Sequence, residues 1–192
     1  FEELCAFDEV ELDPTRLTRM ERAASAYARR LRGLDRDPED LSYTRKWNRH
    51  LLTSSRRTEH APATVGRFAE TEPGHSEEKS RFYRLHRDGL CPTLRAGTGY
   101  ERGSFMAPRP IHPVVDRVIS VREAARLHSF PDWFRFHYSK WHGFRQIGNS
   151  LPPLLGRSIG AELTKAMGLA ISKPDEDLEL GDAQLLKMAT YE

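Results

Sequence analysis

The chain has 192 residues and a mean hydropathy of −0.66, so it can form one modest core under a large polar surface. It contains no apolar run long enough to span a bilayer and no signal-peptide pattern, and its two cysteines, Cys5 and Cys91, exclude a disulfide framework. The net charge of +2 is unevenly spread, because residues 14–169 hold 28 of the 30 Lys and Arg but only 16 of the 28 Asp and Glu. This basic middle between acidic ends favours a polyanion-binding surface.

The first predicted element is a helix from Asp13 to Gly33. Asp13 can cap it, Pro14 suits its first turn and Gly33 can end it. Apolar residues recur at three- and four-residue spacing, as on the buried face of a helix: Leu17, Met20, Ala24, Tyr27 and Leu31. We expect a surface helix that docks through this stripe, followed by loops and short pieces over residues 34–80.

Residues 81–119 predict an irregular β region. Residues 81–86 alternate polar and apolar side chains, as a half-buried strand does. Asp88-Gly89 is a strong hairpin signal, so residues 90–95 are expected to form the returning strand. Prolines at 108, 110 and 113 force an extended course after it.

Two helices are predicted in the last third of the chain. Ser120 and Glu123 form a capping box at the start of a short helix that Pro131 stops. The second helix is expected to be capped by Ser150 after a sharp turn at Gly148-Asn149, with its first amides free to attract an anion. Its apolar stripe consists of Leu155, Ile159, Leu163 and Met167. The aromatic residues of the segment 133–144 are expected to cover the core between these helices.

Three stretches resemble motifs of the cytosine-5 DNA methyltransferase family. Residues 121–132, VREAARLHSFPD, resemble its ninth motif, and residues 146–153, QIGNSLPP, resemble its tenth. Thr93-Leu94, before a glycine-rich loop, resembles the Thr-Leu pair of its target-recognition domain. The order and spacing also match, and the resemblance covers residues 80–168 well.

The resemblance implies an α+β fold: a small irregular antiparallel sheet with flanking helices, whose C-terminal helix completes a Rossmann-like methyltransferase domain outside this chain. We divide the chain into a helical and loop-rich lead-in (1–80), a target-recognition region with the ninth-motif helix (81–140), the tenth-motif turn and helix (141–168) and an acidic tail with a short helix (169–192).

The same resemblance assigns roles to individual residues. Asn149 and Ser150 are expected beside the cofactor S-adenosylmethionine, whose site is shared with the missing upstream half. The ninth-motif residues Arg122, Glu123 and Arg126 are expected to be structural. DNA contacts are expected at the Thr-Leu pair, in the loop that follows it and at one later arginine: Thr93, Leu94, Arg95, Gly97, Gly99, Tyr100, Arg102 and Arg109.

The family's chemistry needs groups that this sequence lacks. A cysteine in a Pro-Cys dipeptide attacks C6 of a flipped cytosine, and a carboxylate in a Glu-Asn dipeptide assists. Neither dipeptide occurs here; Cys91-Pro92 has the reverse order, and Cys5 lies among acids that would raise its pKa. We therefore expect no catalytic residue in this chain and, since it starts at Phe1, expect it to be the later part of a longer enzyme.

The predicted partners are duplex DNA and the catalytic half of a restriction-modification methyltransferase, either in the same polypeptide or as a separate subunit. Self-association through the last helix is a further option, whereas no membrane and no metal ion are expected. The expected location is the prokaryotic cytoplasm, at the nucleoid. Two other classes stay open: a stand-alone or degenerate DNA-binding module without methylation activity, and a protein-interaction domain.

Overall fold

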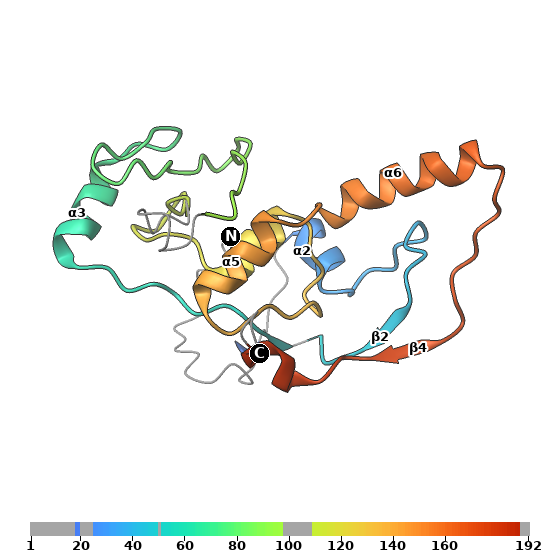
Figure 1. Ribbon diagram of the computed structural model, residues 1–192. Helices are drawn as coiled ribbons and strands as arrows, with labels where there is room; N and C mark the ends of the chain where they lie inside the picture. The colour runs from blue at the N-terminus through green and yellow to red at the C-terminus, as the bar shows by residue number, and fades with distance from the viewer. Residues whose placement is uncertain (1–17, 20–24, 50, 98–108, 189–192) are drawn as a thin grey trace.

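The elements of this protein are short and are joined by long irregular segments (Figure 1). The computed structural model describes residues 18–19, 25–49, 51–97 and 109–188. In chain order the elements are β1 (Thr18–Arg19), α2 (Ala26–Leu31), β2 (Thr44–Lys46), β3 (Leu51–Leu52), α3 (Pro62–Glu70), α4 (Val121–Leu127), α5 (Lys140–Gly148), α6 (Pro153–Ala166), β4 (Asp177–Glu179) and the 3-10 helix η2 (Ala183–Lys187).

The strands form two small ladders. β1 pairs antiparallel with β3, and β2 pairs parallel with β4. Isolated bridges add Ser76 to Tyr83, and join Ile111 to both Arg84 and Val118. The fold is therefore mixed α/β with a small two-stranded parallel sheet and a long C-terminal helix. The expectation of one antiparallel sheet is corrected in this respect.

The long helix predicted from Asp13 to Gly33 is wrong. Residues 18–19 form strand β1, and α2 begins only at Ala26, after Ser25, whose hydroxyl accepts a hydrogen bond from Ala28 N at 3.1 Å. The start predicted at Asp13 lies outside the described residues. Its predicted end is confirmed, since Gly33 follows α2 in the left-handed region with a φ of 61°.

The hairpin predicted at Asp88-Gly89 is also wrong, because both edges of the strand-like segment 83–85 already have partners. On one edge Arg84 N donates to His75 O at 2.8 Å. On the other, Leu85 N donates to Ile111 O at 3.0 Å and Ile111 N donates to Tyr83 O at 2.8 Å. Residues 90–95 thus have no free strand edge to pair with, and they run as an irregular segment.

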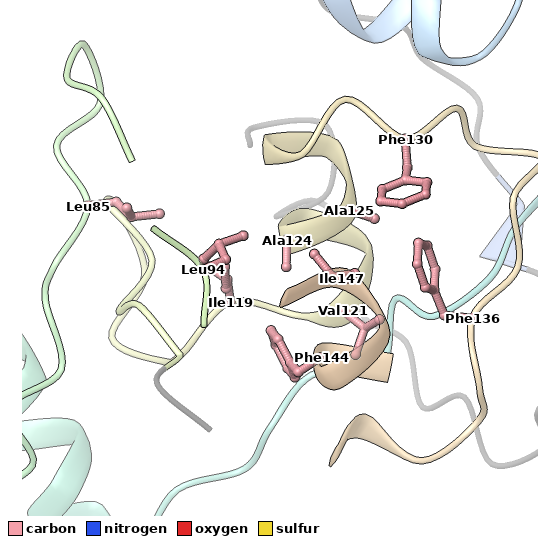
Figure 2. Close-up of a cluster of buried hydrophobic side chains, with 10 residues drawn as sticks. All are labelled: Leu85, Leu94, Ile119, Val121, Ala124, Ala125, Phe130, Phe136, Phe144 and Ile147. Carbon is pink, nitrogen blue, oxygen red and sulfur yellow. The ribbon is translucent and has the colours of Figure 1, made fainter. Parts of the chain in front are cut away.

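The main core lies between α4 and α5 (Figure 2). Its buried side chains are Leu85, Leu94, Ile119, Val121, Ala124, Ala125, Phe130, Phe136, Phe144 and Ile147. The two helices approach so closely that a Cβ on Gly143 would lie 2.9 Å from Val121 Cγ1. Phe136 and Phe144 confirm that part of the predicted aromatic cluster covers this core.

The capping box at the start of α4 is confirmed. Glu123 N donates to Ser120 Oγ at 3.2 Å, and Ser120 N donates to the Glu123 carboxylate at 2.6 Å. That carboxylate also accepts two hydrogen bonds from Arg117, both 2.8 Å long. The hydrogen bonds and the charge of Arg117 hold the pKa of Glu123 low although burial alone would raise it.

Helix α6 extends away from the rest of the molecule (Figure 1). All of its residues are described and none is buried; Leu155, Ile159 and Leu163, together with Met167 at the C-cap, are between 46% and 69% exposed. The chain then returns, and β4 pairs with β2. The predicted short helix of the tail corresponds to η2, whereas β4 was not foreseen.

Two further findings concern only the described part of the chain. None of its helices combines the length and apolarity that crossing a membrane requires. Its His, Cys, Asp and Glu side chains form no group of three or more that could hold a metal ion.

Candidate functional site

The junction between α5 and α6 is a helix end and not the helix start that was predicted. Asn149 caps the C-terminus of α5 with a φ of −91°, and the Ser150 hydroxyl donates to Ile147 O at 2.6 Å. Helix α6 begins only at Pro153, after Pro152, without a side-chain cap. The prediction that Ser150 caps α6 is therefore wrong. The Ile147 carbonyl at the end of α5 accepts hydrogen bonds from both the backbone N–H and the hydroxyl of Ser150, while Pro152 and Pro153 carry no N–H that could donate to the serine oxygen.

The row of bare amides expected at the start of α6 is likewise not present. The two prolines supply no donor, and Leu154 N donates to the Ser129 hydroxyl at 3.1 Å. Ser129 follows α4 and has a φ of 61°, an unusual value for a serine. The start of α6 is thus bound by the end of the ninth-motif stretch, and it does not form an open anion site.

Gly148 is required for close packing and not for a sharp turn. It is not among the described glycines with positive φ. A Cβ at this position would lie 2.4 Å from Ala96 N, 2.5 Å from Arg95 C and 2.6 Å from Ala96 Cα. Only a residue without a side chain lets the segment 93–97 cross the end of α5 so closely. The Thr-Leu segment and the tenth-motif junction, about fifty residues apart in the sequence, are therefore direct neighbours.

Three charged residues of the ninth motif, Arg122, Glu123 and Arg126, are buried and form hydrogen bonds within the protein, as expected for structural roles. Arg122 is fully buried and donates to Thr53 O at 3.0 Å and to Phe134 O at 2.8 Å. Arg126 forms a two-bond ion pair with Asp132, at 3.0 and 2.5 Å. Removing one partner of such a buried ion pair lowers the free energy of unfolding far more than removing one partner of a surface ion pair does.

The predicted DNA-contacting residues separate into three groups. Thr93 and Arg95 are exposed, and Gly97 adopts a φ of 76° that favours glycine. Leu94 is only 5% exposed and packs in the main core, so its side chain is removed from the proposed DNA contacts. Gly99, Tyr100 and Arg102 lie outside the described residues.

Arg109, the remaining predicted DNA contact, is among the described residues; it is half-buried and packs against helix α5. Its guanidinium carbon is 5.0 Å from the centre of the Phe144 ring, a cation–π distance. Burial lowers the pKa of Arg109 from its ordinary value, yet a guanidinium stays charged at any physiological pH.

Lys140, at the other end of α5, is a basic residue that the sequence did not single out. Its Nζ donates to Arg57 O at 2.7 Å and to Thr58 Oγ1 at 3.1 Å. Burial and the positive charges of Arg56 and Arg109 lower its pKa to about 8, although the Glu59 carboxylate acts in the opposite direction. Only the folded arrangement brings these segments together, so no local pattern in the sequence could have indicated it.

Cys91 is poorly suited to nucleophilic chemistry. Burial raises its pKa to about 11, and its Sγ donates to Pro92 O at 3.1 Å. The thiolate, which is the reactive form, is therefore scarce at neutral pH. Cys5 lies outside the described residues.

The three stretches that resemble methyltransferase motifs lie together in the fold: the Thr-Leu segment packs against the Gly-Asn-Ser junction, and the ninth-motif stretch contacts the start of α6. The model of the C-5 cytosine-specific DNA methylase family matches residues 9–165. The chain belongs to this family.

Individual relatives agree with this assignment. The chain is 56% identical over 162 residues to the type II methyltransferase M.XorII of Xanthomonas oryzae pv. oryzae, covering 84% of this chain and 38% of that protein. It is 40% identical over 106 residues to the type II methyltransferase M.AgeI of Thalassovita gelatinovora, covering 55% of this chain and 23% of the relative.

A solved structure extends the similarity to three dimensions. A prophage-encoded E. coli protein, described as a DNA modification methyltransferase, superposes with a TM-score of 0.61 at 31% identity, covering 80% of this chain and 41% of that one. The chain thus spans about two fifths of the length of these larger proteins or less.

Proposed function

We propose that this chain is the C-terminal target-recognition segment of an S-adenosylmethionine-dependent DNA (cytosine-5) methyltransferase. It binds duplex DNA and contributes to the cofactor site, while the catalytic cysteine belongs to polypeptide outside this chain. The observation that supports this proposal most directly is the contact of Gly148 with the Arg95-Ala96 backbone, because it joins a DNA-contacting segment to a cofactor-contacting junction. The relatives' type II names suggest a restriction-modification context and hence a cytoplasmic location at the nucleoid.

The residues at the junction suit one wall of a cofactor site. The Asn149 side chain is exposed and can both donate and accept hydrogen bonds. The Ser150 hydroxyl donates to Ile147 O and lies 3.4 Å from His128 Nδ1, and its oxygen can accept a further hydrogen bond from a donor such as an amine or a ribose hydroxyl. S-adenosylmethionine supplies an electrophilic methyl group when bound. Asn149 and Ser150 hold and orient it, and the rest of the site comes from the upstream half.

Helix α6 supplies the means of joining that upstream half. Its four stripe residues form one apolar face, which stays exposed here. Covering this face with the missing Rossmann-like domain removes it from water and completes that domain. The catalytic half is in the same polypeptide or in a separate subunit, and the docking surface is the same in both arrangements.

The remaining part of the chain binds DNA. Thr93 contacts the backbone near the extruded cytosine, while Arg95 and the following loop, with Gly97, Gly99, Tyr100 and Arg102, lie in or near the major groove, where base edges are distinguishable. The basic middle of the chain gives this surface the charge that a phosphate backbone attracts.

A methyl-transfer assay tests this proposal. Duplex DNA and labelled S-adenosylmethionine are incubated with this chain, with an upstream half, and with their mixture. Methyl incorporation is expected only in the mixture. Incorporation by this chain alone would refute the claim that the nucleophile lies elsewhere.

A pair of variants tests the docking surface separately. Ile159→Asp places a charge in the apolar stripe, and the mixture is expected to lose methyl transfer because burying an unpaired carboxylate is costly. Ser158→Asp adds the same charge next to the stripe, on an exposed position, and should retain it. Equal activity of both variants contradicts docking through this face.

The alternative is a stand-alone or degenerate DNA-binding module without methylation activity. The shielded thiol of Cys91 is compatible with it. Salt-dependent DNA binding without any activity in the mixture would favour this alternative.

A further inference from the structure

Two consecutive residues of the ninth-motif stretch contact the junction between α5 and α6. His128 Nδ1 lies 3.4 Å from Ser150 Oγ, just past the end of α5. The hydroxyl of the next residue, Ser129, accepts a hydrogen bond from Leu154 N at 3.1 Å, in the first turn of α6. The end of the ninth-motif stretch therefore holds both sides of the tenth-motif junction.

The backbone around Ser129 indicates that its side chain matters at this place. Helix α4 ends in a Schellman motif, because Phe130 N donates to Ala125 O at 2.9 Å and Ser129 N donates to Arg126 O at 3.0 Å. Glycine is the usual residue at the left-handed position of this motif, but Ser129 adopts it with a φ of 61°. A glycine would be less strained, yet it would offer no hydroxyl to Leu154 N.

The two distances at Ser150 determine which atom carries each proton. The serine hydroxyl has one proton and gives it to Ile147 O at 2.6 Å, since the contact with His128 is much longer. The hydrogen bond between His128 and Ser150 therefore needs a proton on Nδ1 of the imidazole. Burial lowers the pKa of His128, so the ring is uncharged at physiological pH and its Nε2 carries a lone pair.

These two hydrogen bonds restrict what Ser150 can bind. One lone pair of its oxygen faces the Nδ1–H of His128, and the other lone pair can only accept a hydrogen bond. A ligand group opposite Ser150 must therefore be a donor. S-adenosylmethionine carries such donors in its ammonium group, its ribose hydroxyls and its adenine amino group.

We infer that His128 is a positioning residue of the cofactor site, which directs the second lone pair of Ser150 toward a hydrogen-bond donor of S-adenosylmethionine. Ser129 supports the same junction by fixing the start of α6. The ninth-motif stretch thus contributes to the cofactor wall in addition to its role in the core. This inference rests on the proposed function, since it concerns the same cofactor site.

Equilibrium dialysis of labelled S-adenosylmethionine with the mixture of this chain and the upstream half tests the inference. Leucine and asparagine have nearly the same shape, but only asparagine places a donor where Nδ1 of His128 lies. We expect His128→Leu to weaken binding about fivefold, as the loss of one hydrogen bond does, and His128→Asn to stay within about twofold of the wild type. His75→Leu, at an exposed histidine in the loop after α3, is the matched control and should bind as the wild type does.

A double-mutant cycle separates positioning from a general structural effect. Ser150→Ala removes the residue through which His128 acts, so adding His128→Leu to it should weaken binding no further. If His128→Leu weakens binding by the same factor with and without Ser150, or binds as tightly as the wild type, the inference is refuted and the proposed function stands. If the wild-type mixture binds no S-adenosylmethionine, both are refuted.

The proton on Nδ1 is tested on this chain alone. Nitrogen NMR of the chain with labelled histidines distinguishes a protonated from an unprotonated ring nitrogen, and His128→Asn identifies the signals of His128. We expect Nδ1 to be the protonated nitrogen in the wild type. A proton on Nε2 instead would overturn the inference, whatever the binding experiment shows.

Discussion

The close contact at Gly148 makes Gly148→Ala a sharp test of the packing of this protein. The added Cβ would lie 2.4–2.6 Å from three backbone atoms of residues 95–96, where ordinary contact begins near 3.4 Å. No flexible side chain can give way, so the backbone must move by almost 1 Å, although Leu94 next to it is fixed in the core.

Two opposing contributions decide how much Gly148→Ala changes the free energy of unfolding: overpacking and helix propensity. Overpacking of this kind costs roughly 3 kcal/mol at the upper end of its usual range. Alanine recovers up to about 1 kcal/mol over glycine in a helix. The free energy of unfolding should therefore fall by about 2 kcal/mol, which for a urea m-value near 2 kcal/mol/M moves the midpoint down by about 1 M.

Gly160→Ala is the matched control, since a Cβ there has no atom within 4 Å. It lies inside α6 and should raise the free energy of unfolding by about 0.5–1 kcal/mol through helix propensity alone. Both variants are compared by urea denaturation followed by circular dichroism. If Gly148→Ala matches Gly160→Ala, the segment 93–97 does not cross α5 as described.

Three further outcomes are expected. Glu123→Gln should lower the free energy of unfolding by about 3–5 kcal/mol in urea titrations, because it breaks a buried ion pair, whereas Glu162→Gln on the exposed surface of α6 should stay within about 0.5 kcal/mol of the wild type. Burial would raise the pKa of Glu77, but hydrogen bonds from Ser80 and Lys79 and the charge of Arg67 hold it at about 2, so the stability it contributes is present above pH 4.5 and lost as the pH falls from 4.5 to 2. The urea midpoint of Glu77→Gln should lack this part of the acid dependence. Finally, in a Cys5→Ser background, iodoacetamide should modify the native chain far more slowly at pH 8 than the urea-unfolded chain, since the pKa of Cys91 is about 11; equal rates would contradict its shielding.

The parts of the fold that follow local rules were predictable from the sequence. Ser120 and Glu123 satisfy each other within one helical turn, and the structure has the capping box that their spacing indicates. The end of α2 at Gly33 is a similar case. Such features need only neighbouring residues, so the sequence contains the whole argument.

Features that depend on distant partners were predicted wrongly or not at all. Asp88-Gly89 has the residues of a hairpin, but His75 and Ile111 occupy the strand edges that a hairpin would need. Gly148 was expected to permit a turn, whereas its actual neighbour is a backbone segment fifty residues earlier. Lys140 lacked any local signal because its neighbours Arg56 and Arg109 are brought to it by folding.

At the candidate site, too, features that depend on distant contacts could not be predicted from the sequence. In the structure the ninth-motif stretch, the tenth-motif junction and the Thr-Leu segment lie together, whereas the functional roles assigned to their residues stay predictions. The helix cap predicted at Ser150 is wrong, because its hydroxyl donates to the end of α5 and α6 begins without a side-chain cap, whereas its place beside the cofactor stays a prediction. The DNA-contacting loop beyond Gly97 stays a prediction.

The surroundings of α6 have a mechanical consequence. Near its start Arg157 forms an ion pair with Asp37 at 2.7 Å, and after its end β4 pairs with residues 44–46. One short stretch, residues 37–46, thus anchors the projecting helix near its start and after its end. A partner that binds the exposed face of α6 meets a helix whose orientation is already fixed. Binding therefore costs less orientational entropy than binding to a freely hinged helix would.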